Sequence, residues 1–207
     1  MTDADFKPHL GDDEQALLRG EMLRAKSYLE FGTGGSTVLA AECGIRRIVS
    51  VDSDPAWLRR IGERIAHERA TLDIELIHCN LGRTGDWGMP LDRDLERVAT
   101  WPQYFLQPWQ RFLSCNETPD LILVDGRFRV ACVLYSLLHL HLAHAKFPQR
   151  TTRIAVHDFS DRPYYGRILE HAVIVASAGT MVVVEQNRLS SASLLLQDLF
   201  GFQFDAR

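Results

Sequence analysis

The segment from Tyr28 to Asp52 has the sequence pattern of a strand, a glycine-rich turn, a helix and a second strand that ends in an acid. The first apolar run finishes at Phe31, and Gly32 and Gly34 stand where the chain has to turn sharply into the helix. Small residues at such a turn also let a ligand approach the backbone. Asp52 lies twenty residues beyond Gly32, close to the ~20-residue spacing at which an acid reaches ribose hydroxyls. This segment predicts half of a nucleotide-cofactor site.

The type of glycine turn narrows the choice of cofactor. A P-loop needs GxxxxGK[ST], and no Gly-Lys pair follows this strand. The dinucleotide fingerprint GxGxxG is met at Gly32 and Gly34, but Thr37 stands at its third glycine, which disfavours an NAD site. The remaining pattern, E-x-G-x-G-G from Glu30, resembles motif I of the class I S-adenosylmethionine-dependent methyltransferases. The resemblance implies that Glu30 helps to hold the amino-acid end of that cofactor, directly or through water.

The same resemblance implies where the rest of the cofactor binds. Asn80 follows the third expected strand, where the family recognises adenine, although the usual acid is absent there. Its amide oxygen suits the adenine amino group, Asp86 in the same loop is a competitor, and an ordinary turn asparagine is the alternative. Residues 35–37 can cap the following helix and still offer N–H groups to the cofactor carboxylate. The expected cofactor-binding residues are Glu30, Gly32, Thr33, Gly34, Ser36, Asp52, Ser53 and Asn80.

Strand and helix patterns alternate along the whole chain, which predicts a mostly parallel sheet with helices on both faces. The last two apolar runs, 171–179 and 180–186, are too close for a helical crossover, so one of them must run antiparallel. We therefore expect an α/β, Rossmann-like methyltransferase fold with a seven-stranded sheet and an antiparallel C-terminal hairpin. The single domain covers residues 1–207, with a helical extension over 1–26.

The expected elements follow from apolar periodicity and from turn residues. Proline residues at 102 and 108 are expected to limit helix in the aromatic stretch between 101 and 112. The other expected strands are 27–31, 46–52, 73–79, 120–125 and 153–158, and the expected helices are 11–26, 35–43, 55–67 and 130–145.

Composition excludes several classes of partner. The 207 residues carry a net charge of −4, without the basic footprint of a nucleic-acid-binding protein. Four cysteines are far apart and form no CxxC, which predicts buried free thiols in a reducing compartment. No basic-plus-apolar leader opens the chain, and no apolar run approaches the ~18 residues of a membrane span. We expect a soluble, cytoplasmic protein that binds neither nucleic acid nor membrane.

Acids also close two later strands, at Asp125 and Asp158, and His157 precedes the second of them. Ligands of open α/β sheets bind outside the carboxyl ends of the strands, so all three residues are expected to face the substrate as catalytic groups. Asp125 or His157 could take the proton of a substrate hydroxyl. A less favoured alternative has Asp125 and Asp158 share a divalent cation, and a third alternative makes them helix caps or turn formers.

Three further residues are candidates for substrate binding. Arg127 and Arg129 follow Asp125, and two guanidinium groups would clamp an acidic substrate such as a carboxylated sugar. Solvated surface arginines are the alternative. Trp87 would form a substrate wall or lid, although aromatic residues of this kind more often pack in a core.

The segments EFGTGGST, TGDWG, VDGRFR and VHDF together resemble a small group of bacterial methyltransferase-like proteins. The expected function is transfer of a methyl group from S-adenosylmethionine to an oxygen of a small molecule or saccharide. Two other functions stay open: a module that binds the cofactor without turnover, and an NAD(P)-dependent oxidoreductase.

Overall fold

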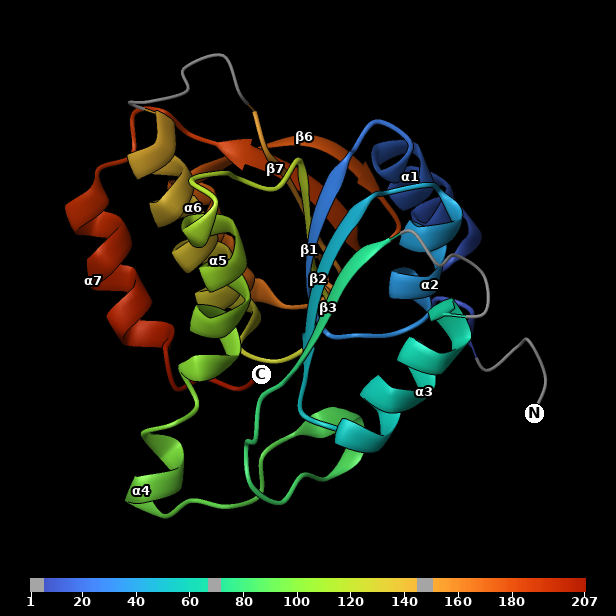
Figure 1. Cartoon of the computed structure of the whole chain (residues 1–207). Coiled ribbons are helices and arrows are strands. Elements are labelled where there is room, and N and C mark those ends of the chain that lie inside the picture. The colour runs from blue at the N-terminus through green and yellow to red at the C-terminus, as the bar shows by residue number, and fades with distance from the viewer. Residues whose placement is uncertain (1–5, 67–71, 145–150) are drawn as a thin grey trace.

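A computed structural model describes residues 6–66, 72–144 and 151–207, which form a seven-stranded sheet between two layers of helices (Figure 1). The strand order is β3-β2-β1-β4-β5-β7-β6. The strands are β1 (Ser27–Phe31), β2 (Arg47–Asp52), β3 (Asp73–His78), β4 (Leu121–Val124), β5 (Arg153–Val156), β6 (Ala172–Ala178) and β7 (Met181–Gln186).

The pairing confirms the predicted fold. Strands β1 to β5 pair in parallel, and β7 lies antiparallel between β5 and β6. The short connection between β6 and β7 makes this reversal, because a helical crossover needs a dozen or more residues.

Helices cover both faces of the sheet (Figure 1). One layer holds α1 (Asp12–Met22), α2 (Gly35–Glu42) and α3 (Pro55–Ala66), and the other holds α5 (Gln103–Ser114), α6 (Arg129–His144) and α7 (Ala192–Phe202). Successive residues of β1 point to opposite layers: Leu29 and Phe31 join the cluster that includes α5 and α6, and Tyr28 joins the cluster that includes α2 and α3. A strand buried on both faces reads as continuously apolar for this reason.

Several elements differ from the sequence-based expectations. The leading helix ends at Met22, four residues earlier than expected, and Leu23 is its C-cap residue. Pro108 lies inside α5; it removes one helical hydrogen bond, but Tyr104, Trp109 and Phe112 bury their side chains along this helix. The α7 helix and a 3₁₀ segment, η3 (Pro163–Glu170), were not predicted. The predicted helix ends at residues 67 and 145 lie outside the described residues.

The four cysteines are free, but only Cys79 and Cys132 are buried, and Cys115 is exposed, contrary to expectation. Among the described residues, no helix combines the length and the apolar character that crossing a membrane requires.

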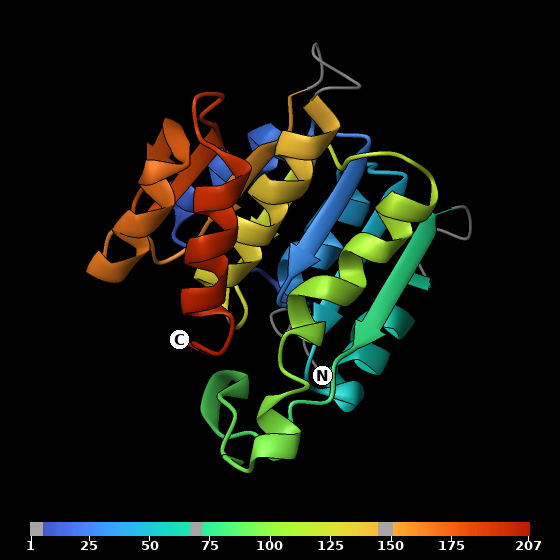
Figure 2. The ribbon, with the colours of Figure 1, turned by 90° about the vertical axis from the view of Figure 1, so that its left-hand side faces the viewer.

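The connection between β3 and α5 extends beyond the carboxyl ends of the strands (Figures 1 and 2). It contains the single turn η2 (Asp86–Gly88) and the short helix α4 (Leu95–Val98). Ligands of open α/β sheets bind at this edge.

Glu14 connects α1 to the turn between β6 and β7. Its carboxylate accepts hydrogen bonds from the Gly11 N–H at 2.9 Å and from the Thr180 N–H and hydroxyl at 2.7 and 2.8 Å. Burial opposes its ionisation, but these hydrogen bonds and the nearby His157 outweigh burial and lower the pKa of Glu14 to about 2. Thr180 lies between β6 and β7, so one carboxylate joins the N-terminal helix to the C-terminal hairpin.

We expect Glu14→Gln to lower the free energy of unfolding by about 1–3 kcal/mol, because an amide NH₂ would face a backbone N–H in place of an acceptor. Urea unfolding at pH 7 measures the change. Asp13→Asn, on the exposed side of the same helix turn, is the control and should cost less than about 0.5 kcal/mol. Equal losses in the two variants would contradict the assigned role of Glu14.

Candidate active site

A cavity of about 850 Å³ opens at the carboxyl ends of β1, β2, β4 and β5. This volume lies within the range of about 300–1,000 Å³ that is usual for small-molecule sites. Its lining comes from five parts of the chain, residues 7–10, 32–36, 52–54 with Trp57, 84–89, and 125–127 with Arg129, completed by Tyr104, His157, Asp158 and Arg162. The cavity thus brings together the glycine turn and the acids that the sequence placed at the strand ends.

The glycines of the turn have different tasks. Gly32 has a φ of +107°, and a Cβ there would lie 2.6 Å from the Gly126 nitrogen, so only glycine lets the ends of β1 and β4 touch. Gly34 is extended, and a Cβ on it would meet no atom of the described residues within 4 Å, its own chain neighbours aside. The space beside Gly34, at the beginning of α2, is therefore open to a ligand.

Glu30 lies beneath this turn and is completely buried. Its carboxylate accepts hydrogen bonds from the hydroxyls of Tyr28, Ser36, Thr37 and Ser50. Burial raises the pKa of Glu30 to about 7, against the opposing effect of these four donors. Glu30 does not line the cavity, and it reaches the cavity through Ser36, which does.

Thr37, which stands at the third glycine position of the dinucleotide fingerprint, supports the glycine turn with its hydroxyl. Its hydroxyl donates to Glu30 and accepts from the Gly34 N–H at 2.9 Å, which fixes the turn. Thr33 is linked to the same network through Ser50, with 2.7 Å between the two hydroxyls. The departure from the NAD pattern is thus part of the hydrogen-bonded support of the turn.

Asp52 and Ser53 line the cavity at the end of β2, as predicted. Burial raises the pKa of Asp52 to about 6, although the backbone N–H of Asp54 donates to its Oδ1 at 3.0 Å. Asn80 does not line the cavity. Its amide oxygen accepts the Gly82 N–H at 3.0 Å within an Asx turn.

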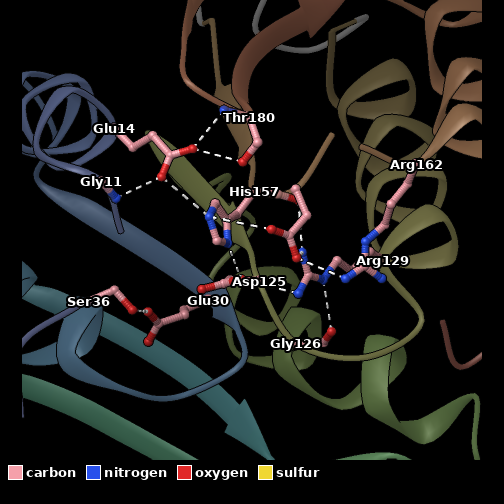
Figure 3. Close-up of polar contacts among 11 residues, drawn as sticks. Gly11, Glu14, Glu30, Ser36, Asp125, Gly126, Arg129, His157, Arg162 and Thr180 are labelled. Atoms are coloured by element: carbon pink, nitrogen blue, oxygen red, sulfur yellow. Dashed lines mark hydrogen bonds and ion pairs between the residues drawn. The ribbon is translucent and has the colours of Figure 1, made fainter. Parts of the chain in front are cut away.

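The acids that the sequence predicts after β4 and β5 belong to a network in which acidic and basic side chains alternate (Figure 3). His157 Nδ1 lies 2.9 Å from Asp125 Oδ1, and His157 Nε2 lies 3.5 Å from Glu14 and 3.6 Å from Asp158. Burial disfavours the imidazolium, but the three carboxylates outweigh burial and raise the pKa of His157 above its usual value. Both ring nitrogens therefore face anions, and the arrangement favours a protonated histidine.

Arg129 holds this network together from inside the protein. Its side chain is only 5% exposed and donates to the Gly126 carbonyl at 3.0 Å, the His157 carbonyl at 2.8 Å and Asp158 Oδ2 at 3.0 Å. It also lies 3.3 Å from Asp125 Oδ1. Arg129 is thus a structural clamp between β4 and β5, and its guanidinium, which the sequence suggested for substrate binding, lines the cavity with these partners already in place.

These contacts also bear on the alternative of a shared cation. The guanidinium of Arg129 lies between Asp125 and Asp158, where it contacts carboxylate oxygens that a metal ion would need. Among the described residues, no group of three or more His, Cys, Asp or Glu side chains is arranged to hold a metal ion.

Arg127 and Trp87, the other two substrate-binding candidates, line the cavity as Arg129 does. Arg127 is 7% exposed, and its Nε is buried without a hydrogen-bond partner among the described residues. Trp87 is 81% exposed in the projecting η2 turn, so it belongs to no core.

Backbone strain gathers at this end of the sheet. Trp87, Phe128 and Asp158 all have φ values near +56°, which non-glycine residues rarely adopt. Such strain persists where the surrounding structure imposes it, and it is common at functional sites.

Sequence reasoning missed two members of the network. Glu14 follows Gly11 by three residues, and a helix-capping pattern at that point is visible in the sequence. Arg162 binds Asp158 Oδ2 at 2.8 Å, four residues apart, but no local pattern marks that pair as part of a site.

Glu30 should make stability depend on pH. Its folded-state pKa is raised, so its contribution is fully present below pH ~4.5 and is lost as the pH rises through about 7. We expect the free energy of unfolding of the wild type, relative to Glu30→Gln, to fall by about 2–4 kcal/mol across this window. Denaturant unfolding at half-unit pH steps measures it. Glu63→Gln, exposed on α3, should leave the wild-type profile unchanged, and parallel profiles for wild type and Glu30→Gln would refute the raised pKa.

Arg129→Met should destabilise the fold by about 3 kcal/mol, because it leaves two partly buried carboxylates without their common partner. Arg83→Met is the control: Arg83 pairs with Asp92 but is 81% exposed, so its loss should cost about 1 kcal/mol or less. Thermal and urea unfolding measure both changes. A loss for Arg129→Met as small as for the control would mean that the clamp does not support the fold.

The fold of this chain is similar to solved structures of methyltransferase-like proteins. No protein-family model matches the chain, and no curated protein matches it either. Among solved structures, a methyltransferase-like protein from Silicibacter pomeroyi is 26% identical, with a TM-score of 0.77, over 97% of this chain and 99% of that one. A candidate caffeoyl-CoA O-methyltransferase from Staphylococcus aureus is 10% identical, with a TM-score of 0.50, over 89% and 88% of the two chains. The chain therefore has the class I S-adenosylmethionine-dependent methyltransferase-like fold.

Proposed function

We propose that this chain transfers a methyl group from S-adenosylmethionine to an oxygen of a small molecule or saccharide. One observation carries the proposal: a single cavity joins the glycine turn and Asp52 to the charged end around Asp125. A cofactor at the first place would present its reactive group toward the second. The similarity to methyltransferase-like structures supports the same assignment.

The residues at the glycine turn suit the cofactor. The space beside Gly34 admits its amino-acid end, where N–H groups at the beginning of α2 and the Ser36 hydroxyl can meet a carboxylate. Asp52 stands at the position for the ribose hydroxyls. Asp86 lines the cavity and Asn80 does not, so Asp86 is the better candidate for the adenine amino group. The bound cofactor would supply a sulfonium methyl group, which is already activated for transfer.

Asp125 is the residue best placed to receive a substrate hydroxyl. Its contacts with His157 and Arg129 involve Oδ1, and Oδ2 accepts no hydrogen bond from a described residue. Oδ2 can accept the hydroxyl hydrogen bond, orient the oxygen and take its proton as the new C–O bond forms. His157 has carboxylates beside both ring nitrogens, and we assign it the role of positioning Asp125. Alignment of the reacting atoms supplies most of the acceleration in such a transfer.

The other two functions have less support. Thr37 locks the turn at the position where a dinucleotide site has glycine, which opposes an NAD(P)-dependent oxidoreductase. A module that binds the cofactor without turnover would not need the ordered charges around Asp125, although it would share the cofactor site.

A thermal-shift titration with S-adenosylmethionine and S-adenosylhomocysteine, with NAD and NADP as controls, tests the cofactor. Ligand at a hundred times its dissociation constant adds ~2.7 kcal/mol, which should raise Tm by roughly 5–10 °C. Gly34→Ala should fold as well as the wild type but bind S-adenosylhomocysteine more weakly, because its Cβ enters the open space. A shift with NAD alone, or no shift with any ligand, would contradict the proposal.

A further inference from the structure

One cation at the charged end of the cavity has no anion among the described residues. Three carboxylates lie there, Glu14, Asp125 and Asp158, and their contacts are with His157, Arg129 and Arg162. Each of these acids thus has a basic partner. Arg127 is a further basic residue at this end of the cavity, and it makes no salt bridge within the part of the chain that the structure describes.

The lack of a salt bridge is unusual for an arginine in the surroundings of Arg127. Its side chain is more than nine-tenths buried, it lines the cavity, and its Nε lacks any hydrogen-bond partner among the described residues. Burial, reinforced by Arg129 and Arg162, lowers the pKa of Arg127. A buried charge without a partner is costly, and structural arginines are normally paired. Arg129, two residues away, shows what a structural arginine looks like in this protein, with three hydrogen bonds to the chain.

The backbone holds Arg127 rigidly in its place. Its carbonyl accepts the Cys132 thiol at 3.3 Å, and Phe128, which follows it, is fully buried with a positive φ. Strain of this kind beside an unpaired guanidinium is expected where a site is built for a ligand.

We propose that the methyl acceptor carries a carboxylate, and that this carboxylate pairs with Arg127 while the acceptor hydroxyl meets Asp125. The inference rests on the proposed function and adds the class of the substrate. A single unpaired guanidinium calls for one negative charge, and its planar fork matches a carboxylate through two parallel hydrogen bonds. Asp125 and Arg127 are two positions apart after β4, which places anchor and reacting group in the same cavity.

The test uses the smallest probe of this chemistry. Protein saturated with S-adenosylhomocysteine is titrated with sodium acetate at constant ionic strength, with sodium chloride as the balancing salt, and Tm is followed. Acetate should raise the Tm of the wild type in a saturable way. Arg127→Met should weaken this response by about tenfold or abolish it, since one charge-assisted pair is lost. Arg59→Met, which removes an exposed arginine on α3, should respond like the wild type.

Two further measurements test whether Arg127 instead supports the fold or binds the cofactor. Without acetate, Arg127→Met should be at least as stable as Arg59→Met, because no partner is lost; a clear fall in Tm would identify Arg127 as structural. Affinity for S-adenosylhomocysteine, measured by calorimetry, should be the same in Arg127→Met and wild type. A weaker affinity would assign the guanidinium to the cofactor carboxylate and overturn the proposal.

The remaining outcomes are equally distinct. An acetate response that is absent from the wild type, or unchanged in Arg127→Met, would overturn the carboxylate site while normal binding of S-adenosylhomocysteine kept the proposed function intact. A stronger Arg127-dependent response to inorganic phosphate than to acetate would overturn the assignment of a carboxylate. Failure of S-adenosylhomocysteine to bind would instead reject the proposed function itself.

Discussion

The order in which strands are added to the sheet reverses at β1, and the site depends on that reversal. Strands β2 and β3 lie on one side of β1, while β4 and β5 lie on the other, so the loops that follow β1 and β4 diverge at the carboxyl edge of the sheet. Gly32 and Gly126 bring the two strand ends into contact below this opening. Any side chain at Gly32 would push β4 away, and the cavity would lose its floor.

Two polar clusters support the two halves of the opening. On one side the Glu30 carboxylate gathers four hydroxyls and fixes the glycine turn from beneath. On the other side Arg129 joins the acids that follow β4 and β5. Both central groups are buried and fully engaged, which suits a site whose shape is set before a ligand arrives. Arg127 stands apart from both clusters, because its charge has no counterpart in the described protein.

Local patterns were sufficient to predict the class of fold. The glycine turn, the acids at strand ends and the short connection between the last two strands each depend on neighbouring residues alone. They predicted a mostly parallel seven-stranded sheet with a terminal antiparallel hairpin, and the structure places the predicted residues Gly34, Asp52, Asp125 and His157 around one cavity. Contacts between distant segments could not be predicted in this way.

Glu14 and Arg129 illustrate the limit of the sequence. Glu14 reads as an ordinary helix-capping acid, and only the tertiary fold brings it to His157 and Thr180. Arg127 and Arg129 look alike in the sequence, yet the fold turns one guanidinium inward to two acids and leaves the other unpaired among the described residues. The Asn80 side chain bonds to its own loop, which agrees with the alternative of an ordinary turn asparagine.

A crystal structure with S-adenosylhomocysteine bound would show whether the cavity is a methyl-transfer site. We expect ribose hydroxyls at Asp52, the amino-acid end beside Gly34, and the sulfur atom directed toward Asp125. A ligand bound elsewhere, or bound with its sulfur directed away from Asp125, would rule out the proposed methyl transfer at this site.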